Sequence, residues 1–141
     1  MTARIVFLAA LLVVGCGAPA ASAQPSLSRE IHGTFRLSNG EEPDRTDGCS
    51  GTGGYSDVRV GTDVVVRDAA GTIIGTSSLT VDADGPEPAG SGAYQCGFAF
   101  VVSGLPESTF YTVAVGKRGE LTYSKAELEA KGWTVGFELG P

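Results

Sequence analysis

The sequence predicts an all-β fold, an antiparallel β-sandwich of about seven short strands with one short helix. Apolar and polar residues alternate in several runs, and turns rich in Gly and Pro separate these runs at close spacing. A helical pattern occurs once, near residues 125–131. A chain of 141 residues, 42% of them hydrophobic, has single-domain size and enough apolar material for one core.

Residues 1–17 have the layout of an export leader. Arg4 supplies a positive charge, and an uncharged, mostly apolar run follows at residues 5–15. A helix of this length would cover only about 16 Å, which is shorter than the ~30 Å hydrocarbon core. The segment is therefore interpreted as a signal peptide and is left out of the predicted fold.

Two cleavage sites compete in this leader. The tetrapeptide VVGC, which ends at Cys16, resembles a bacterial lipobox, where cleavage before the cysteine is accompanied by its lipidation. The tripeptide ASA, which ends at Ala23, fits ordinary signal peptidase and a freely secreted product. We favour lipidation of Cys16, because this cysteine ends the apolar run at the position that the lipidation chemistry requires. Several acyl chains at ~0.8 kcal/mol per buried methylene would then anchor the protein stably. Residues 18–30 are then a flexible tether, and residues 31–141 form the folded domain.

The number of cysteines predicts one disulfide. The chain has three cysteines, and Cys16 is either lipidated or lost with the leader. Cys49 and Cys96 remain in both cases, and an oxidising compartment favours their pairing. This bridge would tie a Gly-rich loop to the core-facing side of a strand.

The alternating runs predict the strands in chain order. The first run, residues 31–38, ends at an Asn-Gly turn. Residues 62–68 and 72–81 form a predicted hairpin, and residues 82–93 form a polar loop. The remaining strands are predicted at residues 96–102, 110–115 and 133–139, with Tyr111 and Trp133 on core faces.

The helix near Lys125–Lys131 has both of its ends marked in the sequence. Ser124 and Glu127 have the spacing of a capping box, in which each side chain binds a backbone N–H of the first turn. Lys131 and Gly132 supply a basic last turn and a C′ glycine. A helix of about two turns is not stable alone, so it must pack against an edge or an end of the sandwich.

Two resemblances agree with this fold. The segments GTDVVVRDAAG (61–71), DADG (82–85), FAF (98–100) and YTVAV (111–115) are similar to carboxypeptidase regulatory-like, or prealbumin-like, domains. That similarity implies an immunoglobulin- or prealbumin-like sandwich. The segments CSGTGGYSD (49–57), CGFAF (96–100) and VGKRG (115–119) resemble small exported proteins and lipoproteins of actinobacteria that have no assigned activity. This second resemblance implies export and the disulfide, and no particular reaction.

The candidate binding residues lie in two loops. The first loop is Gly-rich, but it lacks the Lys and the following helix of a phosphate-binding loop. The second is a basic hairpin tip in an acidic protein, which could bind an anionic partner or a lipid headgroup. The candidates are Gly51, Gly53, Gly54, Tyr55, Lys117 and Arg118.

Metal and catalytic signals are weak. Asp82, Asp84 and Glu87 are calcium candidates, although their loop lacks the third ligand and the distal Glu of an EF-hand. His32 is the only histidine, with no zinc-ligand set and no nucleophile motif around it. We therefore predict no catalytic residue and no cofactor. A net charge of −6 argues against a nucleic-acid surface.

These features predict a non-enzymatic interaction domain of the cell envelope, lipid-anchored to the outer face of the cytoplasmic membrane. Its partner would be an envelope protein or a cell-wall ligand. The alternatives are an exported envelope hydrolase of unknown substrate and a freely secreted, calcium-stabilised domain.

Overall fold

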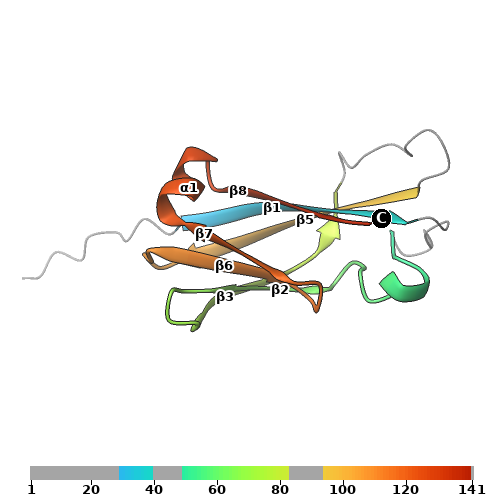
Figure 1. The fold of residues 1–141 in the computed structure, drawn as a ribbon, viewed down its shortest axis with the longest axis horizontal. Helices are drawn as coiled ribbons and strands as arrows, with labels where there is room; N and C mark the ends of the chain where they lie inside the picture. Colours follow the sequence, from blue (N-terminus) through green and yellow to red (C-terminus); the bar gives the residue numbers. More distant parts are fainter. Residues whose placement is uncertain (1–28, 40–48, 83–93, 141) are drawn as a thin grey trace, which may run out of the picture.

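The structure, a computed structural model, describes residues 29–39, 49–82 and 94–140. These residues form two four-stranded sheets packed face to face, which appear as an upper and a lower layer in Figure 1. The predicted all-β sandwich is confirmed, with eight strands in the described part of the chain. No helix within these ranges is long and apolar enough to cross a membrane. The leader, Cys16 and the predicted tether up to residue 28 lie outside the described residues.

The first sheet has the order β4-β5-β1-β8. Its strands are β1 (Arg29–Asn39), β4 (Thr80–Val81), β5 (Tyr94–Leu105) and β8 (Thr134–Leu139). The long strands β1 and β5 pair antiparallel along almost their whole length, whereas β1 and β8 pair in parallel. The first and the last strands described are therefore neighbours.

The second sheet has the order β3-β2-β6-β7 and is antiparallel throughout. Its strands are β2 (Asp63–Arg67), β3 (Ile73–Ser78), β6 (Phe110–Val115) and β7 (Glu120–Ser124). The predicted hairpin turn between β2 and β3 is present, because the Asp68 carboxylate accepts the backbone N–H groups of Ala70 and Thr72.

Several predicted strand boundaries differ from the structure, and two of these differences bear on the fold. Residues 72–81 were predicted as one strand, but β3 lies in the second sheet and β4 in the first. Leu79 between them is fully buried, and its N–H donates to Thr62 O, so the chain changes sheets through a core position. The β-prone residues run on without a break across this crossing, so the sequence does not reveal it. In addition, β1 begins at Arg29, two residues before the predicted domain boundary.

The core lies between the sheets and contains the predicted inward faces. The largest fully buried side chains include Tyr111, Phe35, Phe98, Ile31 and Leu37. Phe35 contacts Phe98 edge-on and stacks on Phe137 at 6.2 Å between ring centroids. Such burial of apolar area is the main stabilising term of the domain.

The short helix α1 (Lys125–Ala130) links β7 to β8 and thus connects the two sheets. Its predicted capping box is confirmed, and its residue Leu128 is fully buried. Lys131 is the C-cap rather than part of a basic last turn. Trp133 precedes β8 with φ 59°, and its half-buried ring contacts Tyr111 edge-on at 5.4 Å.

Candidate functional site

Cys49 and Cys96 form a disulfide, with Cα atoms 5.6 Å apart. Cys96 is buried in β5 opposite Leu37 of β1, so the bridge joins a loop residue to the core of the first sheet. The predicted pairing is thus present in the structure. It fixes the start of the Gly-rich segment, which contains four of the candidate binding residues.

The Gly-rich segment is compact. Gly51 donates its N–H to Val58 O at 2.9 Å, and a single 3₁₀ turn, η1 (Gly53–Tyr55), lies between them. A Cβ on Gly51 would lie 2.2 Å from Tyr55 O, so only glycine fits at this close backbone approach. Gly53 and Gly54 are exposed, whereas Tyr55 is half-buried against the core.

The β6–β7 hairpin tip docks on this segment through Arg118. The guanidinium donates from Nε to Asp57 Oδ2 at 3.0 Å and from Nη2 to Asp57 Oδ1 and Gly54 O. It also lies over the Tyr55 ring, 5.2 Å from the centroid. These hydrogen bonds hold the pKa of the Asp57 carboxyl below its usual value.

This Arg118–Asp57 clamp brings together two groups of residues that the sequence predicted separately. It also changes the role expected for Arg118, because its guanidinium binds within the chain. Lys117 remains exposed at the tip. We call residues 53–59 together with 116–119 the distal surface.

An open hollow of about 400 Å³ lies at the edge of the distal surface. Its walls include the charged residues Asp57, Arg59, Asp63 and Lys117 and the apolar side chain of Val60. The side chains of Arg59 and Lys117 form no hydrogen bond or ion pair with any described residue. Sequence reasoning missed Arg59, since nothing in the pattern around it indicates that residues 59 and 117 meet.

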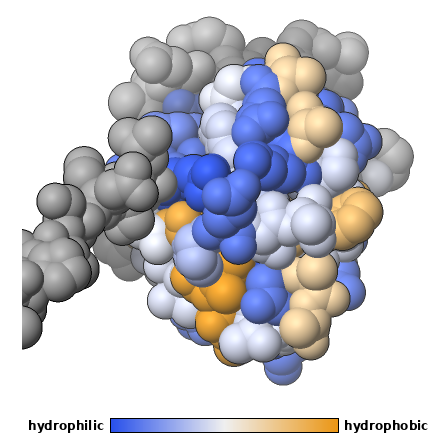
Figure 2. Space-filling view, turned by 90° about the vertical axis from the view of Figure 1, so that its left-hand side faces the viewer, coloured by the Kyte–Doolittle hydropathy of each residue, from blue (hydrophilic) through white to orange (hydrophobic). Residues whose placement is uncertain are grey.

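The distal surface lies at the end of the sandwich opposite the start of β1. In Figure 1 the chain enters β1 at the left, while η1 and the β6–β7 tip are at the right. The eleven residues of β1 separate these ends by about 35 Å at 3.3 Å per residue. Figure 2 shows the end of the sandwich at which β1 begins. The described surface there is mostly hydrophilic, and its apolar residues form separate patches.

The remaining sequence candidates are not brought together. His32 is exposed on β1, and its Nε2 lies 3.6 Å from a carboxylate oxygen of Glu30. Among the described residues, no Ser–His–Asp set forms around it and no group of three metal-ligating side chains occurs. Asp82 donates its N–H to Gly97 O, while Asp84 and Glu87 lie outside the described residues.

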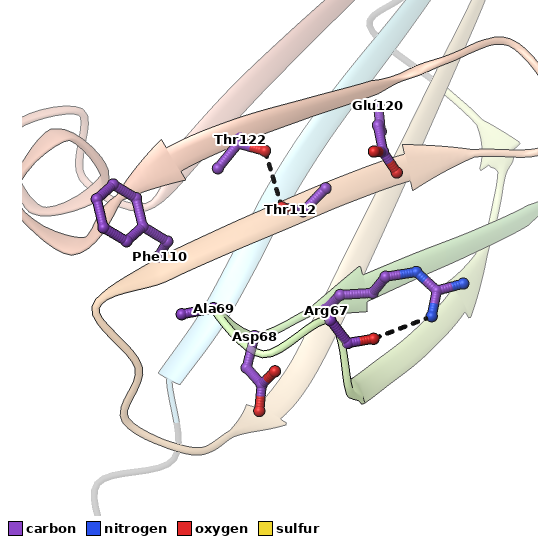
Figure 3. A pocket seen from close by; sticks show the side chains of 8 residues that line it. Arg67, Asp68, Ala69, Phe110, Thr112, Glu120 and Thr122 are labelled. Carbon is purple, nitrogen blue, oxygen red and sulfur yellow. Dashed lines mark hydrogen bonds between the residues drawn. The ribbon is translucent and has the colours of Figure 1, made fainter.

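A second hollow, of about 290 Å³, lies on the outer face of the second sheet and was not predicted. Its floor is a cross-strand row of Arg67, Thr112 and Thr122 from β2, β6 and β7. The Thr112 and Thr122 hydroxyls share a hydrogen bond of 2.8 Å. Figure 3 shows Phe110 on one side of the two threonines, along the strand direction, and Glu120 and Arg67 on the other.

Comparison of the chain with protein-family models, curated proteins and solved structures found no match.

Proposed function

We propose that the chain is an exported, non-enzymatic binding domain of the cell envelope. It is anchored through a lipidated Cys16 and binds an anionic envelope partner through the distal surface. The observation that carries the proposal is the convergence of the Gly-rich segment and the β6–β7 tip. Arg59 and Lys117 line a hollow there, and neither side chain forms a hydrogen bond or ion pair with any described residue.

The shape of the domain would hold the distal surface away from a membrane. The twelve residues between Cys16 and Arg29 reach at most about 40 Å when extended. The start of β1 then stays within about 40 Å of the bilayer, and the distal surface lies up to about 35 Å farther out.

The distal surface is held in place by contacts within the domain itself. The disulfide holds one end of the Gly-rich segment, and the Arg118–Asp57 clamp holds the other. A loop that is already fixed loses less conformational entropy on binding, which favours affinity. Arg118 therefore positions the loop, whereas Arg59 and Lys117 are the cations that contact the partner.

The proposal assigns no reaction to the domain. His32, the residue around which a hydrolase site would form, is exposed on the outer face of β1 and faces Glu30. Exposed ion pairs contribute only about 0–1 kcal/mol each, so the binding of an anionic partner is expected to be moderate and to weaken with salt.

The anchor and the binding surface are tested separately. Mass spectrometry of the mature N-terminus should find an acylated Cys16. A mature N-terminus at Gln24 would contradict the anchor and show that the protein is secreted without it. Capture of envelope components by the oxidised domain should be lost in a double variant, Arg59→Glu with Lys117→Glu. The matched control is Arg36→Glu, an exposed Arg on the outer face of β1. Equal capture by all three proteins would contradict the distal surface as the binding site.

A further inference from the structure

The hollow on the outer face of the second sheet has a lining unlike that of the distal surface. Phe110 is 48% exposed there, although large aromatic side chains are usually buried. Beside it on the sheet lie the two hydroxyls of Thr112 and Thr122 (Figure 3). The charged residues are Arg67, Asp68 and Glu120.

The hydrogen bonds of this hollow leave several groups available. The shared Thr112–Thr122 bond uses one hydroxyl proton, so the second hydroxyl still donates and both oxygens still accept. Arg67 binds Gly71 O through Nη1, and its other N–H groups form no hydrogen bond with any described residue. Glu120 forms no side-chain hydrogen bond or ion pair with any described residue.

This lining discriminates between classes of ligand. A simple anion would meet the carboxylates of Asp68 and Glu120, and a simple cation would meet Arg67. A purely apolar molecule would cover Arg67, Glu120 and the two hydroxyls without replacing their hydrogen bonds to water. The ligand that fits is uncharged, with one apolar face and several hydroxyl groups.

We propose that this hollow is a saccharide-binding site for a single sugar ring. The C–H face of the ring packs on Phe110. Its hydroxyls accept from Arg67 and a Thr hydroxyl and donate to Glu120 and the Thr oxygens. The volume of about 290 Å³ lies at the lower limit of small-molecule sites, about 300–1,000 Å³, which fits one ring rather than a longer enclosed chain. The site is independent of the distal surface.

Nuclear magnetic resonance titration of the oxidised domain with glucose and with N-acetylglucosamine tests the site. The amide signals of Phe110, Thr112 and Thr122 should shift with at least one sugar, with a dissociation constant of about 1 mM. Phe110→Ala should weaken binding about tenfold, and Phe110→Tyr should retain it, because the aromatic face is kept. Val101→Ala is the matched control, since Val101 is 44% exposed on β5 of the opposite sheet.

Two outcomes would overturn the saccharide site. One is the absence of shifts at Phe110, Thr112 and Thr122 with both sugars in the folded wild-type domain. The other is unchanged affinity in folded Phe110→Ala. Arg59→Glu with Lys117→Glu should leave the sugar titration unaltered, so failure of the distal surface and failure of this hollow remain distinguishable.

Discussion

Gly33 in β1 has no side chain, and this allows the Phe100 ring to pack directly on the backbone of β1. The Phe100 ring lies across it, and an added Cβ would stand 1.9 Å from Phe100 Cζ. Gly33→Ala should therefore destabilise the domain by about 1–3 kcal/mol through overpacking. Urea unfolding of the variant measures this loss.

A matched control is available on the neighbouring strand. Gly136 in β8 is exposed, and among the described residues a Cβ there would contact only Thr34 Oγ1, at 3.7 Å. Gly136→Ala should change the free energy of unfolding much less than Gly33→Ala. Equal losses in the two variants would mean that strand glycine itself, rather than the Phe100 contact, determines the effect.

Tyr111 combines core packing with a hydrogen bond to the preceding loop. Its hydroxyl donates to Pro106 O at 2.9 Å and accepts from Ser108 N at 2.9 Å, an arrangement resembling the tyrosine corner of β-sandwiches. Tyr111→Phe keeps the ring but leaves both backbone groups without this partner. Thermal unfolding should show a loss of about 1–2 kcal/mol. Tyr123→Phe removes a hydroxyl that forms no hydrogen bond with any described residue, and it should have little effect.

The Arg118–Asp57 clamp gives the distal elements a dependence on pH. Because the folded-state pKa of Asp57 is lowered, its contribution to stability is present above the unfolded-state pKa of about 3.9. The contribution is lost as the pH falls through the lower folded-state pKa. Since the Asp57 side chain is 46% exposed, the contribution should not exceed about 1 kcal/mol.

Asp57→Asn should thus destabilise the domain at pH 7, and the difference from wild type should vanish below the folded-state pKa of Asp57. Urea unfolding across pH 2–7 measures this difference. Asp63→Asn is the control, since Asp63 lines the same hollow and its carboxylate forms no hydrogen bond or ion pair within the described part of the chain. A constant difference across the pH range would exclude the clamp as its source.

Local signals at the level of single elements were sufficient to predict α1 and the hairpins. The Ser124–Glu127 capping box and the Asp68 turn depend on neighbouring residues, so the sequence reveals them. The crossing at Leu79 and the positive φ of Trp133 depend on contacts with distant segments. The same limit explains why Arg59 and the row through Thr112 were missed, because strand pairing brings these residues to their sites.

At the scale of the whole molecule, the disulfide closes a long loop. Cys49 and Cys96 are separated by 47 positions, for which the chain-entropy model gives about 4 kcal/mol. Replacing both cysteines by Ala should lower the free energy of unfolding by up to this amount, measured by urea unfolding. Reduction of wild type should give a similar loss. A reduced domain as stable as the oxidised one would contradict this account.

The parallel pairing of β1 with β8 affects how the molecule can assemble. Register partners such as Phe35 and Phe137 are about a hundred positions apart in the sequence, so this ladder is strongly non-local. During synthesis, β1 can meet β5 well before β8 exists, and one edge of the first sheet stays open until residues 134–139 emerge. Refolding should therefore be slow, on the millisecond-to-second scale of high-contact-order proteins, and chains that stop before β8 should present an unsatisfied edge to proteases and to each other.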